Sequence, residues 1–175
     1  TTLFRSGADH VMTMTLHSPQ VHGFFSVPTD HLTADEVFVD YFRTCDLSNA
    51  IVVSPDIGHA KRASRLAKQL GIGVAAGDKE RLADESVAIS TIIGDVEGHD
   101  VIVFDDEIAT GGSVCELVSL LDKRRVGRIT LACTHGVFSG PAIARLSAMD
   151  RVYEIVTTNT VPIPAYKRLP NMRVL

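Results

Sequence analysis

The stretch that decides the fold of this chain reads Val101-Ile102-Val103-Phe104-Asp105-Asp106-Glu107-Ile108-Ala109-Thr110-Gly111-Gly112-Ser113. Its first four residues form a short apolar run, which is typical of a strand buried on both faces of a parallel sheet. After Ser113, apolar residues recur at helical spacing from Val114 to Leu121, which predicts a helix. The stretch therefore predicts a strand, a turn and a helix in succession, with two carboxylates at the end of the strand.

The turn between this strand and this helix has the features of a phosphate site. Its two glycines allow the backbone to approach an anion closely, and the first N–H groups of the helix have no intrahelical partner. Asp105 and Asp106 can only accept hydrogen bonds when ionised, so they suit sugar hydroxyls or a hydrated Mg²⁺. A phosphorylated sugar would satisfy both halves. The residues alone also allow a plainer interpretation, in which the acidic pair begins an ordinary loop and residues 110–113 only cap the helix.

Outward from this stretch, strand and helix patterns alternate, which predicts an α/β fold: a mainly parallel sheet flanked by helices, with ligands at the carboxyl ends of its strands. Further strands are predicted at 10–15, 51–53, 73–76, 89–93, 128–133 and 152–156, with an edge strand at 172–175. Helices are predicted over 63–70, with Gly71 as the C-cap, and over 141–148. The mixed-charge residues 77–86 are expected to form a solvated loop.

One further helix is predicted after Thr33, because Thr33 and Glu36 have the spacing of a capping box. Its buried stripe is expected to contain Val37, Phe38, Tyr41 and Phe42. Residues 1–7 resemble the last turn of another helix, with Gly7 at its C-cap. We therefore expect the chain to be the C-terminal part of a longer protein.

Length and composition describe one ordinary globular domain. The chain has 175 residues, of which 45% are hydrophobic and 22% charged. A net charge of -4 argues against a dedicated nucleic-acid surface, and no apolar run is long enough to span a membrane. The three cysteines lack metal-ligand spacing, so we expect reduced thiols in a cytoplasmic protein.

Five segments resemble those of one family in the same order. Asp-Asp-x-x-x-Thr-Gly-Gly-Ser resembles the ribose 5-phosphate loop of the phosphoribosyltransferase-type fold, which phosphoribosyltransferases share with ribose-phosphate pyrophosphokinases. Residues 16–32 resemble a Leu-His-x-x-Gln-x-x-Gly-Phe-Phe-x-x-Pro-x-Asp-x-Leu segment of the pyrophosphokinases, and so do 54–58 (Ser-Pro-Asp-x-Gly), 79–81 (Lys-x-Arg) and 134–142 (Thr-His-Gly-x-Phe-Ser-Gly-Pro-Ala). The resemblance covers essentially the whole chain, as one domain over 1–175 that is similar to the family's C-terminal domain.

This resemblance implies transfer of the diphosphate of ATP to the 1-hydroxyl of ribose 5-phosphate, which gives PRPP and AMP for nucleotide biosynthesis. The 5-phosphate would be bound by the loop residues Ala109, Thr110, Gly111, Gly112 and Ser113. Asp105 and Asp106 would hold the ribose hydroxyls, directly or through a metal. The resemblance also implies an enzyme that works as a homo-oligomer of the full-length chain, without nucleic acid or membrane partners.

Three further roles follow from the resemblance. His17 and Asp56 are the implied contacts of Mg²⁺, which accompanies ATP as co-substrate. Lys79 and Arg81 are the implied catalytic cations, because transferred phosphate needs positioned positive charge. His135 is a nucleotide contact or an ordinary hydrogen-bonded residue, and the sequence leaves both open.

The sequence departs from the family at Ser18-Pro19 and at His59, where a second glycine is usual, and Glu107 has no assigned role. Two other functions stay open: a phosphoribosyltransferase that consumes PRPP with a base, and a non-catalytic regulatory relative of the pyrophosphokinase. Because the family's N-terminal domain supplies part of the ATP site, we expect this chain alone to bind ribose 5-phosphate but to turn over poorly.

Overall fold

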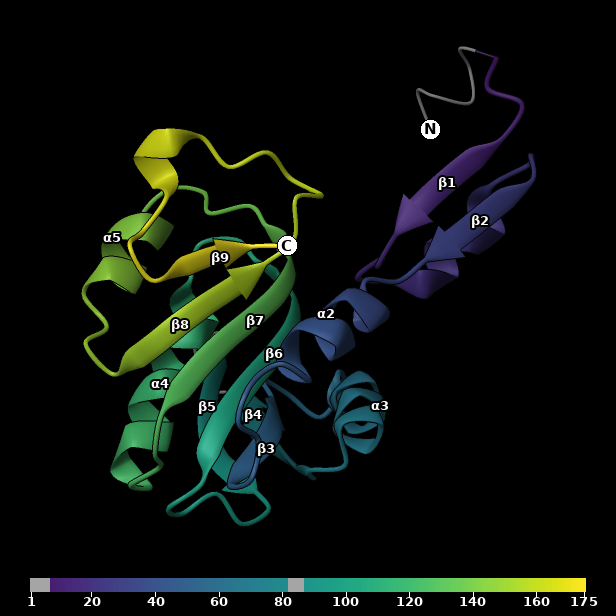
Figure 1. The fold of residues 1–175 in the computed structure, drawn as a ribbon. Helices are drawn as coiled ribbons and strands as arrows, with labels where there is room; N and C mark the ends of the chain where they lie inside the picture. The colour runs from purple at the N-terminus through teal and green to yellow at the C-terminus, as the bar shows by residue number, and fades with distance from the viewer. Residues whose placement is uncertain (1–6, 82–86) are drawn as a thin grey trace.

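The computed structural model describes residues 7–81 and 87–175. A seven-stranded sheet lies at the centre of this described part (Figure 1). The strand order is β5-β4-β3-β6-β7-β8-β9, and all neighbours are parallel except β4 and β5. The strands are β3 (Ala50–Ser54), β4 (Gly73–Arg81), β5 (Val87–Ile93), β6 (Asp100–Ile108), β7 (Ile129–Gly136), β8 (Val152–Thr157) and β9 (Met172–Val174). The predicted α/β class is confirmed, and so is the edge strand near the C-terminus.

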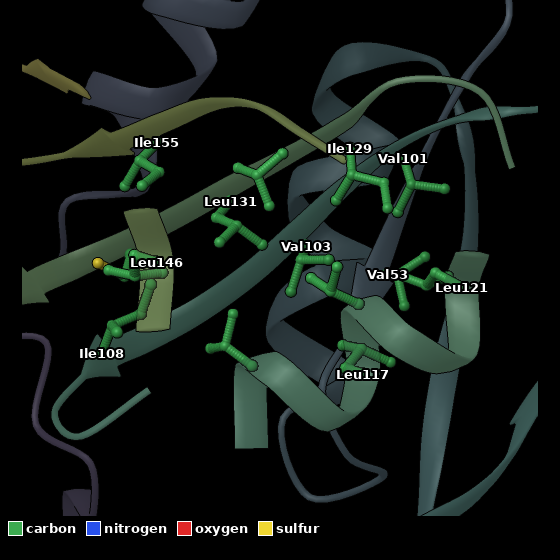
Figure 2. Packing of buried hydrophobic residues seen from close by; sticks show 14 of the residues in the cluster. Val53, Val101, Val103, Ile108, Leu117, Leu121, Ile129, Leu131, Leu146 and Ile155 are labelled. Atoms are coloured by element: carbon green, nitrogen blue, oxygen red, sulfur yellow. The ribbon is translucent and has the colours of Figure 1, made fainter. Parts of the chain in front are cut away.

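Helices cover both faces of this sheet, as an α/β fold requires. One face packs on α4 (Gly112–Lys123) and α5 (Ala142–Ser147), and the other on α2 (Asp35–Phe42) and α3 (Ala60–Leu70). Alternate residues of β6 serve the two faces, so Val103 packs with Leu117 of α4 whereas Phe104 packs with Phe38 of α2. Figure 2 shows the larger of these two cores. Buried side chains on both faces fix the central strand, and with it the position of the turn that follows.

The N-terminal strands stand apart from the main sheet. β1 (Val11–Met14) and β2 (Thr29–Leu32) pair in parallel with each other, joined through the 3₁₀ helix η1 (Pro19–Phe24), and project beyond α2 (Figure 1). A second 3₁₀ helix, η2 (Ala165–Lys167), precedes β9. Among the described residues, no helix is both long and apolar enough to cross a bilayer.

Three strands, β4, β6 and β7, end at least three residues later than the sequence predicts. β6 continues to Ile108 because its ladder with β7 runs on as far as Ile108 and Gly136, so the acidic residues lie on the strand itself. β4 continues to Arg81 because residues 78–81 pair in antiparallel fashion with β5, which corrects the loop predicted from residue 77. Residues 82–86, and the helical turn predicted for residues 1–6, lie outside the described residues.

The capping box predicted for α2 is wrong, and the predicted buried stripe is confirmed at Phe38 and Phe42 but wrong at Val37. The helix begins at Asp35, and no side-chain hydrogen bond caps its described N-terminus. The Ala34 N–H instead donates to Thr15 Oγ1 at 3.2 Å. Because the helix is rotated relative to the prediction, Val39 is fully buried whereas Val37 is 44% exposed.

Because of this orientation of α2, we expect a valine-to-alanine substitution to destabilise the protein more at position 39 than at position 37. Val39→Ala should lower the free energy of unfolding by about 1–3 kcal/mol, because it leaves a cavity in the core. Val37→Ala removes the same atoms from an exposed position, so its effect should stay within about 0.5 kcal/mol. Urea denaturation of both variants measures the difference. Equal losses would contradict the observed orientation of α2.

Candidate active site

A pocket of about 190 Å³ lies at the carboxyl ends of β3 and β6. This is the edge at which open α/β sheets bind their ligands. Three segments of the chain that are remote in sequence meet there: the segment after β1, which contributes His17, the turn between β3 and α3, and the turn between β6 and α4. The lining residues are His17, Asp56, His59, Asp105, Asp106, Glu107, Ile108, Ala109, Thr110, Gly111, Gly112, Ser113 and Val114.

The backbone of the turn between β6 and α4 is arranged to present its amides to the pocket. Its carbonyl groups are bonded to the protein: the oxygens of Ile108 and Ala109 accept from the N–H groups of Phe138 and Ser139, at 3.0 and 2.9 Å. Within the part of the chain that the structure describes, no hydrogen bond is donated to the protein by the amides of residues 109–113. With the carbonyls taken and the amides unused, the turn offers several donors to an anion.

Glycine and arginine hold this turn in shape. Gly111 is the N-cap of α4 and has a φ of 75°, a left-handed conformation that costs a residue with a Cβ roughly 1–2 kcal/mol. Arg145 of α5 reaches across, and its Nη1 donates to the Thr110 carbonyl at 2.9 Å. This contact keeps a further carbonyl away from the pocket. The sequence prediction did not include Arg145, which lies 35 residues beyond Thr110.

The two adjacent aspartates of β6 have different surroundings, since consecutive residues of a strand point to opposite faces. Asp106 is 4% exposed, and the Glu107 N–H donates to its Oδ1 at 2.9 Å. Asp105 accepts from the Asp106 N–H at 2.8 Å. Burial and the neighbouring Asp106 carboxyl raise the pKa of Asp105. Burial opposes ionisation of Asp106 as well, yet its contacts with His59, Asp105 and His17 hold its pKa below the usual range.

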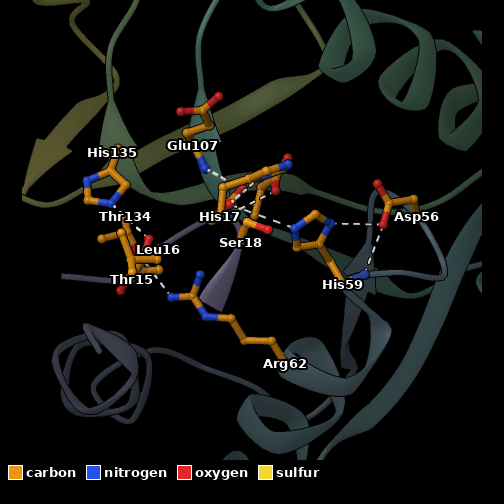
Figure 3. A network of polar contacts seen from close by, with 12 residues as sticks. Thr15, Leu16, His17, Ser18, Asp56, His59, Arg62, Glu107, Thr134 and His135 are labelled. Carbon is orange, nitrogen blue, oxygen red and sulfur yellow. Dashed lines mark hydrogen bonds and ion pairs between the residues drawn. The ribbon is translucent and has the colours of Figure 1, made fainter. Parts of the chain in front are cut away.

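Two histidines face the Asp106 carboxylate, and Figure 3 shows both of them together with Asp56. His17 Nδ1 lies 2.6 Å from Asp106 Oδ2, and His59 Nε2 lies 3.8 Å from the same oxygen. On its other side, His59 Nδ1 lies 2.9 Å from Asp56 Oδ1, which also accepts the His59 backbone N–H at 2.9 Å. His59 thus sits between two carboxylates. The sequence marked it only as a departure from the family pattern.

The helix that carries His59 is anchored by a buried ion pair. Arg62 of α3 donates to Asp35 Oδ1 at 2.9 Å and to Thr134 Oγ1 at 2.9 Å, which ties α3 to α2 and β7. Its guanidinium also lies over the Phe104 ring, 4.7 Å from the centroid. These contacts fix the first turn of α3, and His59 with it.

The carboxylates around His59 give it an unusual protonation. Its contact with Asp106, followed by that with Asp56, raises the pKa of His59 to about 9 in spite of its burial. His59 is therefore cationic at neutral pH. Its ion pairs stabilise the fold fully below its ordinary pKa of 6.5, and this contribution is lost as the pH rises through 9.

An NMR titration of the imidazole C–H resonances tests this protonation. In the unsubstituted protein, His59 should titrate near pH 9. In the Asp106→Asn variant the partner charge is absent, so the midpoint should fall towards about 6.5. A His59 midpoint that is the same in both proteins would contradict the assigned ion pair.

The pocket also groups atoms that could ligate a metal. His17, His59 and Asp106 each offer one ligand atom, and these atoms lie within 4.8 Å of one another. Of the two metal contacts implied by the sequence, His17 belongs to this group. Asp56 lies in the same pocket and is separated from Asp106 by His59.

His135 lies away from the pocket lining and is bonded to the protein on both sides. Its Nε2 donates to the carbonyl oxygens of Met14 and Thr15, both at 3.1 Å, and its Nδ1 lies 2.9 Å from Thr160 Oγ1. Thr15 is buried and has a φ of 43°, which is rare for a β-branched residue. The geometry supports the structural alternative for His135, which holds the strained turn that delivers His17.

Lys79 and Arg81 both lie on β4, opposite Ile89 and Val87 of β5. The structure describes only the backbone of these two residues. Their catalytic role therefore remains a prediction.

Comparison with known proteins identifies what this chain is similar to. Residues 31–161 match the family model described as the phosphoribosyl transferase domain. A Streptomyces coelicolor relative, provisionally named ribose-phosphate pyrophosphokinase, is 56% identical over 99% of this chain and 55% of its own length. The ribose-phosphate pyrophosphokinase of Deinococcus radiodurans is 50% identical over 94% of this chain and 52% of its own length. The chain thus spans about half the length of the curated relatives that it matches.

Solved structures show the same similarity. The crystal structure of phosphoribosylpyrophosphate synthetase from Mycobacterium smegmatis is 37% identical, with a TM-score of 0.89, over 99% of this chain and 56% of that one. A purine phosphoribosyltransferase from Pyrococcus horikoshii is 17% identical, with a TM-score of 0.52, over 96% of this chain and 87% of that one. The second likeness concerns the fold alone.

Proposed function

The chain belongs to the phosphoribosyl transferase domain family, and from that premise we propose that it supplies the ribose 5-phosphate half of a ribose-phosphate diphosphokinase site. In the proposed reaction, the 1-hydroxyl oxygen of ribose 5-phosphate attacks the β-phosphorus of ATP. The bond between the β-phosphorus and the oxygen bridging it to the α-phosphorus breaks, AMP leaves, and the hydroxyl proton passes to solvent. The products are PRPP and AMP.

The observation that carries this proposal is the run of unused amides from Ala109 to Ser113. A phosphate monoester is a dianion with three terminal oxygens, and such a group suits convergent N–H donors at a helix N-terminus. The pocket beside the turn contains acceptors that can bind sugar hydroxyls, Asp105 and Asp106. A phosphate site next to hydroxyl acceptors is what a sugar phosphate requires.

The acidic pair would orient the sugar for attack. In this proposal, Asp105 and Asp106 hold the ribose 2- and 3-hydroxyls, directly or through a metal, and so fix the direction of the 1-hydroxyl. Because Asp106 already faces two imidazoles, it can accept fewer hydrogen bonds from the sugar than Asp105 can. Catalysis then rests on positioning and on stabilisation of charge, without a covalent intermediate on the protein.

A divalent cation fits the donors on the opposite wall of the pocket. His17 and Asp106 offer a nitrogen and a carboxylate oxygen there, and Asp56 lies in the same pocket. Mg²⁺ typically binds one or two carboxylates together with substrate phosphates, so we propose that it arrives with ATP. Bound in this way, it neutralises charge on the transferred diphosphate. The proposal also includes Lys79 and Arg81 as cations beside that group, a cytoplasmic location and an oligomeric full-length protein.

The nature of the products tests the proposal. The full-length protein, given ribose 5-phosphate and ATP labelled in its γ-phosphate, should form AMP and labelled PRPP in equal amounts. Formation of ADP would indicate transfer of a single phosphoryl group and would contradict the proposal. So would loss of PRPP that depends on an added purine or pyrimidine base, which is the activity of a phosphoribosyltransferase.

A further inference from the structure

The pocket is poor in positive charge for a ligand that carries two negative charges. A phosphate monoester is largely dianionic at neutral pH. Of the described residues that line the pocket, none is a lysine or an arginine, whereas four are carboxylic acids: Asp56, Asp105, Asp106 and Glu107. The cationic His59 already lies between two of these carboxylates. Within the described part of the chain, a further positive charge at the phosphate turn can therefore come only from behind the lining.

Arg145 of α5 places such a charge behind the turn. Its Nη1 donates to the Thr110 carbonyl at 2.9 Å, and a Cβ at Gly112 would lie 3.6 Å from the same nitrogen. The guanidinium therefore lies against the turn, although Arg145 does not line the pocket. Burial raises the pKa of Cys115 in the first turn of α4, and the charge of Arg145 opposes that shift. The electrostatic effect of Arg145 thus reaches the N-terminus of α4.

The bond to Thr110 connects this charge to the anion site through one peptide group. The Thr110 carbonyl and the Gly111 N–H belong to the same peptide unit, so a cation bonded to the oxygen polarises that N–H and makes it a better donor. The carbonyls of Ile108 and Ala109 accept from backbone N–H groups, whereas that of Thr110 accepts from a side chain. Replacing Arg145 therefore removes one contact of the turn and leaves the two backbone contacts in place.

The helix that carries Arg145 is itself packed against the turn. A Cβ at Gly111 would lie 3.7 Å from the Cα of Ala142, so the turn and the first residue of α5 are almost in contact. Ala142 is fully buried, which fixes the start of the helix. Arg145 lies three residues further along, on the same face of α5. Because Arg145 itself is exposed, its replacement should leave this packing intact.

We propose that Arg145 is a positioning residue that acts through the Thr110 carbonyl and makes the phosphate turn prefer a dianionic ligand to a monoanionic one. This inference rests on the proposed function, because it takes the 5-phosphate of ribose 5-phosphate to be the ligand of the turn. It goes further in giving a role to a residue outside the pocket, to which the family resemblance assigns none. Coulomb energy is proportional to the charge of the ligand, so Arg145 should favour a dianion about twice as strongly, in free energy, as a monoanion.

Binding of ribose 5-phosphate and of ribose 5-sulfate to the full-length protein tests this role. The two ligands have the same shape, but at about pH 8 the phosphate is a dianion and the sulfate a monoanion. Arg145→Gln should weaken binding of the phosphate about tenfold and binding of the sulfate only about threefold. Arg145→Lys keeps the charge, so the ratio of the two affinities should stay within about twofold of that in the unsubstituted protein. Arg124→Gln, which removes an exposed arginine at the far end of α4, is the matched control and should bind both ligands as the unsubstituted protein does.

Steady-state formation of AMP by the full-length protein gives a second readout. Arg145→Gln should raise the KM for ribose 5-phosphate about tenfold and leave kcat within about twofold of its original value. The reason is that the turn holds the 5-phosphate equally before and during the transfer at the 1-hydroxyl.

Two results would overturn the role of Arg145 and leave the proposed function in place. One is an affinity for ribose 5-phosphate in Arg145→Gln that equals that of Arg124→Gln. The other is an equal loss for both ligands, which would mean that Arg145 supports only the shape of the turn. A comparison within the unsubstituted protein covers the case in which Arg145→Gln does not fold: the phosphate should bind at least about threefold more tightly than the sulfate, and equal affinities would reject the preference. Failure of the proposed function differs from all of these, because the unsubstituted protein would then bind neither ligand, and the role of Arg145 would be rejected with it.

Discussion

Ser113→Asp is expected to weaken ribose 5-phosphate binding by at least about 100-fold while leaving the fold intact. Ser113 is exposed in the first turn of α4, beside the amides of the phosphate turn. A carboxylate at a helix N-terminus interacts favourably with the helix dipole, so thermal stability should stay the same or rise. The same carboxylate would occupy the anion site and repel the phosphate. Loss of two or three charge-assisted hydrogen bonds, each worth about 1.5–3 kcal/mol, accounts for the size of the effect.

Ser119→Asp is the matched control for this experiment. Ser119 lies in the same helix and is also exposed, but it is more than one turn further from the pocket. Ser119→Asp introduces the same charge as Ser113→Asp, so any general effect of net charge on the binding of an anionic ligand appears in both variants. Calorimetric titration measures affinity, and thermal unfolding confirms the fold. Undiminished affinity in Ser113→Asp would place the phosphate elsewhere.

Lys79→Ala is expected to lower kcat by about 10²–10³ with little change in the KM for ribose 5-phosphate. A cation that stabilises the charge of the transition state, but not the bound sugar phosphate, affects kcat selectively. The measurement is the steady-state formation of AMP by the full-length protein. Lys68→Ala, an exposed lysine of α3, is the control and should keep full activity. If Lys79→Ala were as active as Lys68→Ala, the catalytic assignment of the β4 lysine would be wrong.

The local architecture of the phosphate turn could be predicted from sequence because its causes are local. An apolar run long enough for one strand, a Gly-Gly turn and a helical repeat from Val114 to Leu121 follow one another without interruption. The structure has β6, the turn and α4 in this order, with the positive φ at Gly111. The family resemblance then supplied the chemistry that a strand–turn–helix alone leaves open.

The resemblance implied His17 and Asp56 at the site, but the contacts that form the opposite wall of the pocket could not be predicted, because they join distant parts of the chain. His17 and Asp106 are separated by 89 residues, and they meet only because β1 ends in the turn held by His135. His59 appeared in the sequence as an irregular position in a glycine motif. Its role between Asp56 and Asp106 became apparent only from the fold.

Two errors in the predicted elements have one cause, which is pairing or packing that overrides local pattern. The polar residues after Gly77 resemble a loop, but pairing with β5 extends β4 to Arg81. In α2, the predicted stripe included Val37, yet packing against α3 and the sheet turns Val39 inward. In each case the residues are compatible with both states, and tertiary contacts decide.

The claim on which the account depends is that the amides of residues 109–113 bind the phosphate of ribose 5-phosphate. Titration of ¹⁵N-labelled protein with ribose 5-phosphate, with ribose as the control, measures this directly. The account predicts saturable shifts concentrated on the amides of Ala109, Thr110, Gly111, Gly112 and Ser113, with ribose leaving them in place. If these resonances stayed unchanged at saturating ribose 5-phosphate, the proposed phosphate site would be contradicted.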